Sequence, residues 1–393
     1  MFLQEQHLLY ELAYTLVVKE NFNLLHINKE DNEIWLEKVE HKKSKVIRLL
    51  HKGFDWKNHL KTDVARVFQK TKAIKKLLTG KTIDIYNVYI STHQPVDSWE
   101  ELKRPMLLKE KNPPVMNVYY ISLNDPGDEI ARLKKDIDIQ HFEFNVVEDD
   151  QEAETMIQQY KLKIASILYA KQEAVKSVFS FGKPFLTYIL IALNVMMFAV
   201  MIAAGSSTDP EHLVRFGAKF NPLIIEGEWW RIISSMFLHS GFIHILMNMV
   251  ALYYLGIIVE RIYGSWRFMW IYLLAGIGGG LASFAFSVYV SVGASGAIFG
   301  LFGALLFFGL IHKKIFMQTM GRGILTVIGI NIAIGLTIPQ IDMSAHIGGL
   351  ITGFLAAAIC YLPKKHHIGI QVVAALSYTG IIGALVIYGL NIW

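Results

Sequence analysis

Cysteine is almost absent from this chain of 393 residues: the only one, Cys360, lies inside an apolar run. An internal disulfide and a cysteine-based zinc site are therefore excluded. The sequence contains neither a GxGxxG segment after a predicted strand nor a GxxxxGKS/T phosphate loop. The amino-terminal segment MFLQEQHLLYELAYTLVVKE lacks a basic stretch followed by an apolar core, so no signal peptide is predicted. The net charge of +5 is too small to indicate nucleic-acid binding.

Charged residues are scarce in the second half of the chain. The first 183 residues contain 27 acidic and 28 basic side chains, whereas the last 210 contain only 6 and 10. Soluble globular domains average about a quarter charged residues, so the first part fits a soluble domain and the second does not. The overall composition, 53% apolar and 18% charged, averages two different regions. It excludes a disordered chain, a collagen-like chain and a single soluble enzyme.

Long apolar runs dominate the part that lacks charge. A membrane-spanning helix needs about 20 apolar residues, with a range of roughly 17 to 25. Seven runs meet this requirement: Pro184–Ala204, Gly241–Ile258, Trp266–Val290, Ser295–Ile311, Gly321–Ile338, Ala345–Leu362 and Ile368–Trp393. Because so many apolar runs in succession are not typical of a soluble core, the sequence predicts an all-α polytopic membrane bundle of seven transmembrane helices.

Lysine and arginine predict how this bundle is oriented. They lie before the first run and in the loops between runs two and three, four and five, and six and seven: Lys161, Lys163, Lys171, Lys176, Lys183, Arg261, Arg267, Lys313, Lys314, Arg322, Lys364 and Lys365. The opposite loops, Tyr289–Val292 and Pro339–Met343, contain neither residue type. Because basic residues remain on the cytoplasmic side, we expect the amino terminus inside and the carboxyl terminus outside the cell membrane.

The long loop after the first run is the exception, because it contains Arg215, Lys219 and Arg231. It also contains Trp229 and Trp230. Tryptophan and basic residues together are typical of segments at the membrane–water interface. We therefore expect this loop to lie in the interface on the outer side.

Four polar side chains stand out inside the predicted spans, where polar groups are costly and indicate packing or function. His244 and Asn248 belong to span two, Ser295 to span four and His346 to span six. These spans enter the membrane from the outer side, so all four residues are expected at a similar depth near the outer face. His244 and Asn248 are four residues apart and share one face of their helix.

Ser295 lies in the segment Gly293-Ala-Ser-Gly296 at the start of its helix. A serine in this position can expose its hydroxyl beside free backbone N–H groups that would stabilise an oxyanion, and histidine is the usual general base. Each residue alone has an ordinary alternative explanation, because small residues pack helices together and an intramembrane histidine can belong to a structural hydrogen bond. The residues themselves leave two functions open: a serine-type hydrolytic site and a polar transport path.

The ordered set of motifs resembles the rhomboid family of intramembrane serine proteases. The matching segments are Trp230-Arg231, His239, His244-Ile-Leu-Met-Asn248, Glu260-Arg261, Gly293-Ala-Ser-Gly296 and Ala345-His-Ile-Gly-Gly349 with Gly353. The resemblance covers residues 184–362 and implies a six-helix catalytic core followed by one further helix, a known variant of the family. Each segment alone is weak, but together they are specific.

This resemblance implies a Ser–His dyad with Ser295 as the nucleophile and His346 as the general base. The Ser295 N–H, His244 and Asn248 would hold the oxyanion. The substrates would be transmembrane segments of other proteins, with no cofactor and no metal. Phe299 replaces a tyrosine that packs on the catalytic histidine in several bacterial relatives, and a phenyl ring can still stack there. Because the serine and the histidine are both present, the inactive branch of the family does not fit.

Four glycines are expected to bring the two catalytic helices together. Gly296 and Gly300 follow Ser295, and Gly349 and Gly353 follow His346, each pair with small-xxx-small spacing. Such pairs let helices approach closely. The sequence therefore predicts a close crossing of spans four and six.

The soluble part, residues 1–150, reads as a small α/β domain. Helices are predicted over Leu3–Lys19 and Trp56–Leu78, and strands over Glu33–Glu40, Lys45–Leu50, Ile83–Ile90 and Val115–Leu123. The order resembles nuclease-like cores, but the domain has no convincing acidic active-site set, and its histidines have no metal-ligand spacing. Residues 151–183 are predicted to form a connecting helix, residues 184–362 the six-helix core and residues 363–393 the seventh span.

The partners expected for this architecture are transmembrane protein substrates, the lipid bilayer and a cytoplasmic partner of the soluble domain, but no nucleic acid. An alternative function remains beside proteolysis. The chain could act as a non-proteolytic adaptor that binds membrane proteins and recruits partners through its cytoplasmic domain.

Overall fold

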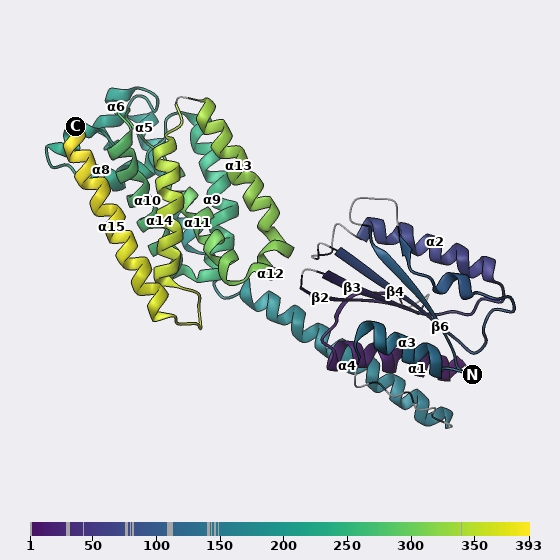
Figure 1. The fold of residues 1–393 in the computed structure, drawn as a ribbon. Coiled ribbons are helices and arrows are strands. Elements are labelled where there is room, and N and C mark those ends of the chain that lie inside the picture. Colours follow the sequence, from purple (N-terminus) through teal and green to yellow (C-terminus); the bar gives the residue numbers. More distant parts are fainter. Residues whose placement is uncertain are drawn as a thin grey trace. The chain divides into compact units, whose positions relative to one another are not determined.

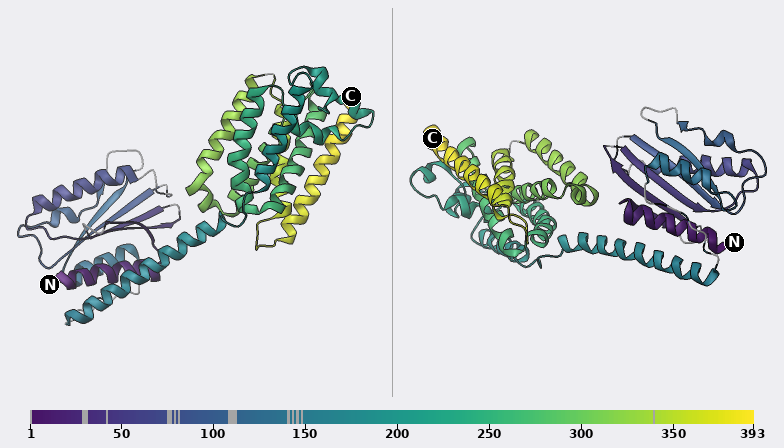
Figure 2. Two further views of the ribbon diagram at one scale, coloured as in Figure 1. Left: turned by 180° about the vertical axis from the view of Figure 1, so that it is seen from behind. Right: turned by 60° about the horizontal axis from the view of Figure 1, so that its bottom comes forward.

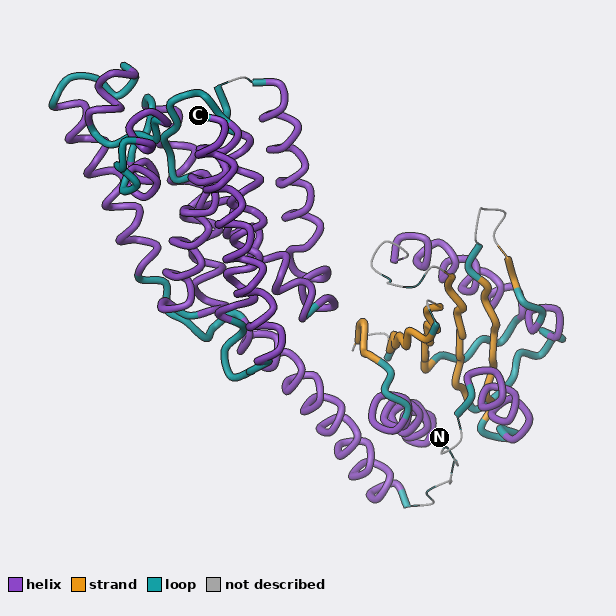
Figure 3. The backbone as a smooth tube through the Cα atoms, turned by 60° about the vertical axis from the view of Figure 1, so that its left-hand side comes forward, coloured by secondary structure: helices purple, strands orange, loops and turns teal. Residues whose placement is uncertain are grey.

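The computed structural model describes residues 2–393 apart from 29–31, 42, 75–77, 79, 81, 108–112, 140, 141, 143, 145, 146, 148 and 339. Pro339 of the predicted outer loop and residues 75–77 of the helix predicted over Trp56–Leu78 lie outside this description. The chain divides into two compact units, Met1–Gln172 and Glu173–Trp393, which are drawn in Figure 1. Figure 3 shows that, over the described residues, the strands lie in the first unit and the second consists of helices and loops.

The first unit is built on a six-stranded sheet with the strand order β1-β2-β3-β4-β6-β5. The strands are β1 (Asn23–Asn28), β2 (Glu33–Glu40), β3 (Lys43–His51), β4 (Thr82–Ser91), β5 (Met106–Leu107) and β6 (Val115–Ser122). The pairs β1–β2 and β2–β3 are antiparallel, β3–β4 and β4–β6 are parallel, and β5 is antiparallel to β6. The parallel strands are buried on both faces, and β4 is buried throughout from Ile85 to Ser91.

Helices cover both faces of this sheet (Figure 2). α1 (Phe2–Tyr14), α3 (Gly127–Ile137) and the first half of α4 (Asp150–Val178) pack on one face, and α2 (Lys57–Ile74) packs on the other. The predicted helices and central strands are present, but β1, β5 and α3 were not predicted. α3 follows the turn at Asn124-Asp-Pro-Gly127 directly and buries Ile130, Leu133 and Ile137 against the sheet.

The second unit is a bundle of helices. Those that follow α4 are α5 (Leu186–Ala203), α6 (Pro210–Arg215), α7 (Asn221–Ile225), α8 (Arg231–Ser234), α9 (Phe242–Tyr263), α10 (Ser265–Phe286), α11 (Ser295–Ile311), α12 (Lys313–Phe316), α13 (Arg322–Thr337), α14 (Met343–Cys360) and α15 (Ile368–Ile392). Over the described residues, six helices are long and apolar enough to cross a membrane: α5, α9, α10, the continuous run Lys313–Thr337, α14 and α15. The chain is therefore a multi-pass membrane protein.

The remaining predicted span is α11, an apolar helix of only 17 residues. At about 1.5 Å per residue it is roughly 25 Å long. Its side chains from Gly296 to Leu305 are all buried in the core of the bundle. Because protein rather than lipid surrounds it, α11 can start below the surface of the bundle, after the uncharged segment Ser287–Gly293.

Two basic side chains fix the loop between α5 and α9, which the sequence predicted to be an interface segment. Arg231 donates to the Val214 and Ala218 carbonyls and pairs with Glu228. Lys219 is 1% exposed, and its ammonium donates to the carbonyl oxygens of Ser287 and Tyr289. The second contact ties this loop to the segment that leads into α11.

Glu260 connects two spans at the opposite end of the bundle. Its carboxylate accepts from the backbone N–H groups of Phe185, Leu186 and Thr187, which are the free donors at the start of α5. It also accepts from the Thr187 and Ser265 hydroxyls. A fully buried carboxylate is tolerated here because five donors and the helix dipole stabilise it.

Candidate active site

Ser295 is the first residue of α11 and is half-buried. The turn before it depends on Gly293, whose φ of +126° lies in a region that favours glycine. The N–H of Gly293 donates to the Ser235 carbonyl at 2.9 Å, and the N–H of Ala294 donates to Nε2 of His239 at 3.4 Å. These two hydrogen bonds fix the backbone of the two residues before Ser295. They leave its own N–H among the first donors of α11, which have no acceptor within the helix.

His346 lies in the first turn of α14, and Asp342 caps that helix. Oδ1 of Asp342 accepts from the N–H of Ala345 at 3.1 Å, and the Asp342 carbonyl accepts from the N–H of His346 at 3.2 Å. Oδ2 accepts a hydrogen bond from the Ser283 hydroxyl of α10. The carboxylate of Asp342 is thus engaged in holding the start of α14 on α10. Nδ1 of His346 is buried and has no hydrogen-bond partner among the described residues.

The ring of Phe299 lies flat on the imidazole of His346, with ring centroids 4.1 Å apart and planes 11° apart. Phe299 comes one helical turn after Ser295, and residues at this spacing share one face of a helix. The face of α11 that carries Ser295 is therefore the face that meets His346. The geometry brings the proposed nucleophile and the proposed base to the same side of the α11–α14 contact.

The backbones of α11 and α14 touch at the four glycines that the sequence singled out. A β-carbon on Gly349 would clash with the carbonyl oxygen of Gly296, and one on Gly353 would clash with Gly300. A β-carbon on Gly296 would lie 3.4 Å from the Ala345 carbonyl oxygen, at the residue before His346. The close approach of these helices thus depends on residues without side chains.

His244 and Asn248 lie on α9, the helix that follows the interface loop. Nδ1 of His244 accepts from the N–H of Ser240 at 3.3 Å, so the ring proton lies on Nε2. A β-carbon on Gly293 would be only 2.8 Å from that Nε2, which places the His244 donor beside the turn before Ser295. Asn248 is buried, and its amide donates one hydrogen bond to the His244 carbonyl at 2.9 Å. A second amide N–H of Asn248 is left for another acceptor.

His239 supports this arrangement from the loop before α9. Its ring is fully buried and meets the ring of His244 edge-on, with centroids 5.2 Å apart. Burial, followed by the charge that His244 would carry, lowers the pKa of His239 to about 3. The ring is therefore neutral at physiological pH. This neutral form can accept the hydrogen bond from the Ala294 N–H.

Two supporting residues were not given their roles by the sequence. Asp342 was placed in the predicted outer loop Pro339–Met343, but it is the cap of the helix that carries His346. Lys219 was assigned to the interface, but its buried ammonium holds the segment before Ser295. Asp342 lies three residues before Ala345, where an apolar run starts. This pattern is a recognisable helix-capping signal. No comparable signal marks Lys219.

The arrangement can perform nucleophilic chemistry. It combines a hydroxyl at a helix start, an imidazole on the facing helix and N–H donors around the turn that joins them. Among the described residues no group of three or more His, Cys, Asp or Glu side chains could hold a metal ion.

Comparison with known proteins points in the same direction. The model of the Rhomboid domain family matches residues 226–363. The chain is 37% identical to rhomboid protease GluP of Bacillus subtilis (strain 168) over 367 residues, which cover 92% of this chain and 71% of that protein. It is 32% identical to rhomboid protease AarA of Providencia stuartii over 221 residues, 49% of this chain and 78% of that protein. It is also 36% identical to putative rhomboid protease YdcA of Bacillus subtilis (strain 168) over 150 residues, 38% of this chain and 75% of that protein.

Proposed function

This chain belongs to the rhomboid family and is an intramembrane serine protease, and from that premise we propose that Ser295 and His346 form its catalytic dyad. The observation that carries the proposal is the stacking of Phe299 on His346 at 4.1 Å, one helical turn from Ser295. The close glycine crossing of α11 and α14 supports it, because it leaves no room for a side chain between the two helices. Its substrates are transmembrane proteins.

In the first step Oγ of Ser295 attacks the carbonyl carbon of the scissile peptide bond, and His346 takes the hydroxyl proton. Because Nδ1 of His346 is buried and has no described partner, Nε2 is the nitrogen that accepts the proton. His346 then donates this proton to the leaving amine as the peptide bond breaks. A water molecule hydrolyses the acyl-enzyme, with His346 as the base again.

The oxyanion that forms in both steps is proposed to lie between the N–H of Ser295, Nε2 of His244 and the free amide N–H of Asn248. The hydrogen bond from Ser240 to Nδ1 of His244 supports this role, since it keeps the other ring nitrogen as a donor. Pre-oriented donors of this kind stabilise the charge that develops in the transition state.

No acidic residue is proposed to assist His346. The carboxylate oxygens of Asp342 already accept hydrogen bonds from the Ala345 N–H and the Ser283 hydroxyl. Asp342 therefore acts on His346 through the helix start that it caps.

The site is proposed to open toward the outer side of the membrane, with the amino-terminal unit in the cytoplasm, where a cytoplasmic partner could reach it. The Lys and Arg residues at the ends of the spans support this orientation. Single cysteines in a Cys360→Ser background test it. A membrane-impermeant thiol reagent should label Ser207→Cys in intact cells and Lys364→Cys only after lysis. The reverse pattern would contradict the orientation.

The proposed dyad is tested by reconstituting the purified protein in liposomes with a model transmembrane substrate. Cleavage should fall to background in Ser295→Ala and His346→Ala, and by roughly 100-fold or more in His244→Ala. Ser344→Ala and His366→Ala are matched controls, because they remove a hydroxyl and an imidazole elsewhere on α14 and on the loop after it. Cleavage that survives Ser295→Ala would exclude this dyad. In cells, loss of a membrane protein that does not depend on Ser295 would instead favour the adaptor function.

A further inference from the structure

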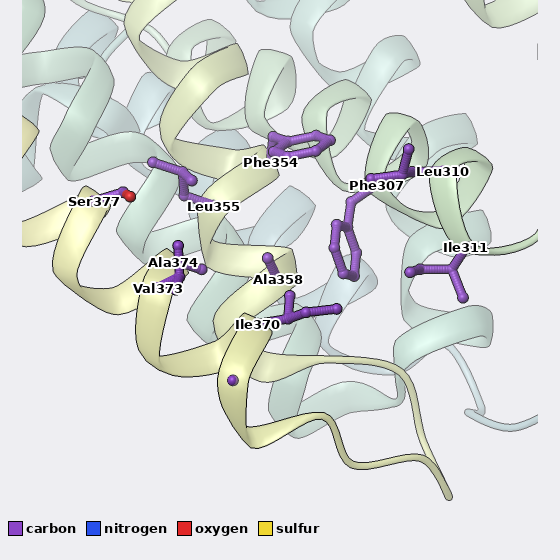
Figure 4. A pocket seen from close by; sticks show the side chains of 11 residues that line it. Phe307, Leu310, Ile311, Phe354, Leu355, Ala358, Ile370, Val373, Ala374 and Ser377 are labelled. Atoms are coloured by element: carbon purple, nitrogen blue, oxygen red, sulfur yellow. The ribbon is translucent and has the colours of Figure 1, made fainter.

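A groove of about 530 Å³ lies over α14, between α11 and α15, near the end of the bundle where α14 ends and α15 begins (Figure 4). Its walls are apolar side chains from three spans, among them Phe307 and Ile311 of α11, Phe354 and Ala358 of α14, and Ile370 and Val373 of α15. Ser377 supplies a hydroxyl at its edge. This groove is separate from the site around Ser295, which lies at the other end of α11.

Hydrogen bonds hold the groove open. Nε2 of Gln371 on α15 donates to the Ile359 carbonyl of α14 at 2.8 Å. About two turns further along α15, the Tyr378 hydroxyl donates to the Leu274 carbonyl of α10 at 3.0 Å. Both bonds fix α15 against α14 and α10. The helix cannot move onto α11 and close the groove without breaking both of these partly buried hydrogen bonds, which is costly.

Positive charge surrounds the same end of the bundle. Lys364 and Lys365 lie in the connection between α14 and α15, just before the groove residue Ile370. Burial and the positive charge of Lys365 lower the pKa of His312, the residue that follows α11. The Lys365 ammonium therefore acts at the end of α11 as well as at the start of α15. Arg267 adds a further cation, since its guanidinium donates to the Cys360 carbonyl at 3.3 Å.

The two segments next to the groove contain no carboxylate, and the carboxylate of Glu260, which lies at the same end, accepts hydrogen bonds from the start of α5 and from Ser265. Residues 309–325, which include the end of α11 and Lys313 and Lys314, have no Asp or Glu. The same is true of residues 358–377, from the end of α14 into α15. The apolar groove thus ends beside Lys364 and Lys365, in segments that contain no Asp or Glu.

We propose that the groove binds an acyl chain of an anionic phospholipid whose phosphate lies against Lys364 and Lys365. The chain would replace bulk lipid along the walls formed by α11, α14 and α15, where its methylenes contact apolar side chains on three sides. The phosphate would contact the lysines at the depth where lipid head groups lie. Basic sites between transmembrane helices recognise anionic head groups in this way. The inference does not depend on the catalytic assignment.

The test measures which lipid the full-length protein retains. The protein is purified from nanodiscs that contain phosphatidylglycerol and phosphatidylcholine, and native mass spectrometry counts the lipids that remain bound in detergent. We expect retained phosphatidylglycerol. Removal of both cations in Lys364→Gln/Lys365→Gln should weaken its binding roughly 30-fold. Val373→Trp, which places an indole in the groove, should abolish retention.

Matched controls separate this site from general effects. Val372 and Val373 are neighbours on α15, 51% and 64% exposed, and only Val373 is among the groove residues, so Val372→Trp should retain the lipid. Lys134→Gln/Lys135→Gln removes two adjacent lysines from α3 and should also have no effect. If Val373→Trp does not fold, Leu310→Trp fills the groove from α11, where Leu310 is 67% exposed. Equal retention of the two lipids, or unchanged retention in the lysine and groove variants, would overturn the proposal.

Discussion

The phenyl ring of Phe299 on α11 stacks on the imidazole of His346 on α14, with ring centroids 4.1 Å apart. This contact joins the helix that begins with Ser295 to the helix that Asp342 caps. It fixes the plane of the imidazole without a carboxylate partner for its ring. A Ser–His dyad needs such a support, because no third side chain orients the base.

The first prediction concerns this stack. Phe299→Leu keeps an apolar side chain but removes the ring, and an aromatic contact contributes about 0.5–1.5 kcal/mol beyond its buried area. We expect kcat to fall by roughly 3- to 10-fold, while Phe299→Tyr retains activity. Phe302→Leu is the control: this side chain is equally buried, at 4% exposed, and its ring packs edge-on against Phe299. Equal effects of the two leucine variants on kcat would contradict a specific role for the stack.

The second prediction concerns the crossing of α11 and α14. Even alanine at position 349 would place a β-carbon against the Gly296 carbonyl oxygen, so the helices must separate. We expect Gly349→Ala to lower substrate cleavage at least tenfold and the free energy of unfolding by about 1–3 kcal/mol, while the protein still inserts. A β-carbon at Gly380 on α15 meets no atom within 4 Å, so Gly380→Ala should be harmless. Normal cleavage by Gly349→Ala would show that the crossing is not needed.

The third prediction concerns Asp342 as a positioning residue. Asp342→Ala removes the cap of α14 and the bond to Ser283, and loss of a cap costs about 1 kcal/mol. If the loss of the cap disturbs the orientation of His346 by this free energy, kcat decreases by about fivefold with little change in KM. Asp342→Asn keeps a capping oxygen and should recover most of the rate. If Asp342→Asn were as slow as Asp342→Ala, the rate would depend on the charge at position 342 and not on the cap. This result would indicate direct electrostatic assistance.

The fourth prediction concerns the buried Lys219. Burial lowers the pKa of its ammonium to about 8, whereas lysine in an unfolded chain titrates near pH 10.4. Between these values the unfolded state binds more protons than the folded state, so the free energy of unfolding rises with pH. Below about pH 8 Lys219 is charged in both the folded and the unfolded state, and the cost of burying the charge lowers the free energy of unfolding.

Denaturation in detergent micelles at stepped pH tests this. The stability of the wild type should rise relative to Lys219→Met between about pH 8 and about pH 10.4. Parallel stability curves for the two proteins would contradict the lowered pKa. Lys183→Met, at the opposite end of the bundle, controls for general effects of removing a lysine.

Much of the fold could be predicted because apolar length and helical spacing are local properties. The run Ser295–Ile311 was predicted as a span, and α11 has those bounds. α3 was not predicted, although Ile130, Leu133 and Ile137 have helical spacing. β1 was missed because it is an edge strand whose side chains are only partly buried, so its apolar pattern is weak.

The parts of the site that escaped prediction depend on contacts between distant segments. The partner of Asp342, Ser283, precedes it by 59 residues, and the Lys219 ammonium meets carbonyls 68 and 70 residues away. Every residue type has a backbone carbonyl, so these acceptors cannot be recognised from the sequence. The crossing of α11 and α14 could be anticipated from glycine spacing, but which carbonyl meets which glycine follows only from packing.

The most direct measurement of the central claim is the site of labelling by a serine-directed fluorophosphonate. The reagent is applied to the reconstituted protein, and the labelled peptide is sequenced by mass spectrometry. If Ser295 is the nucleophile that His346 activates, the label lies on Ser295 in the wild type, is absent in Ser295→Ala and is strongly reduced in His346→Ala. A label on another serine, or one that persists in Ser295→Ala, would contradict the dyad.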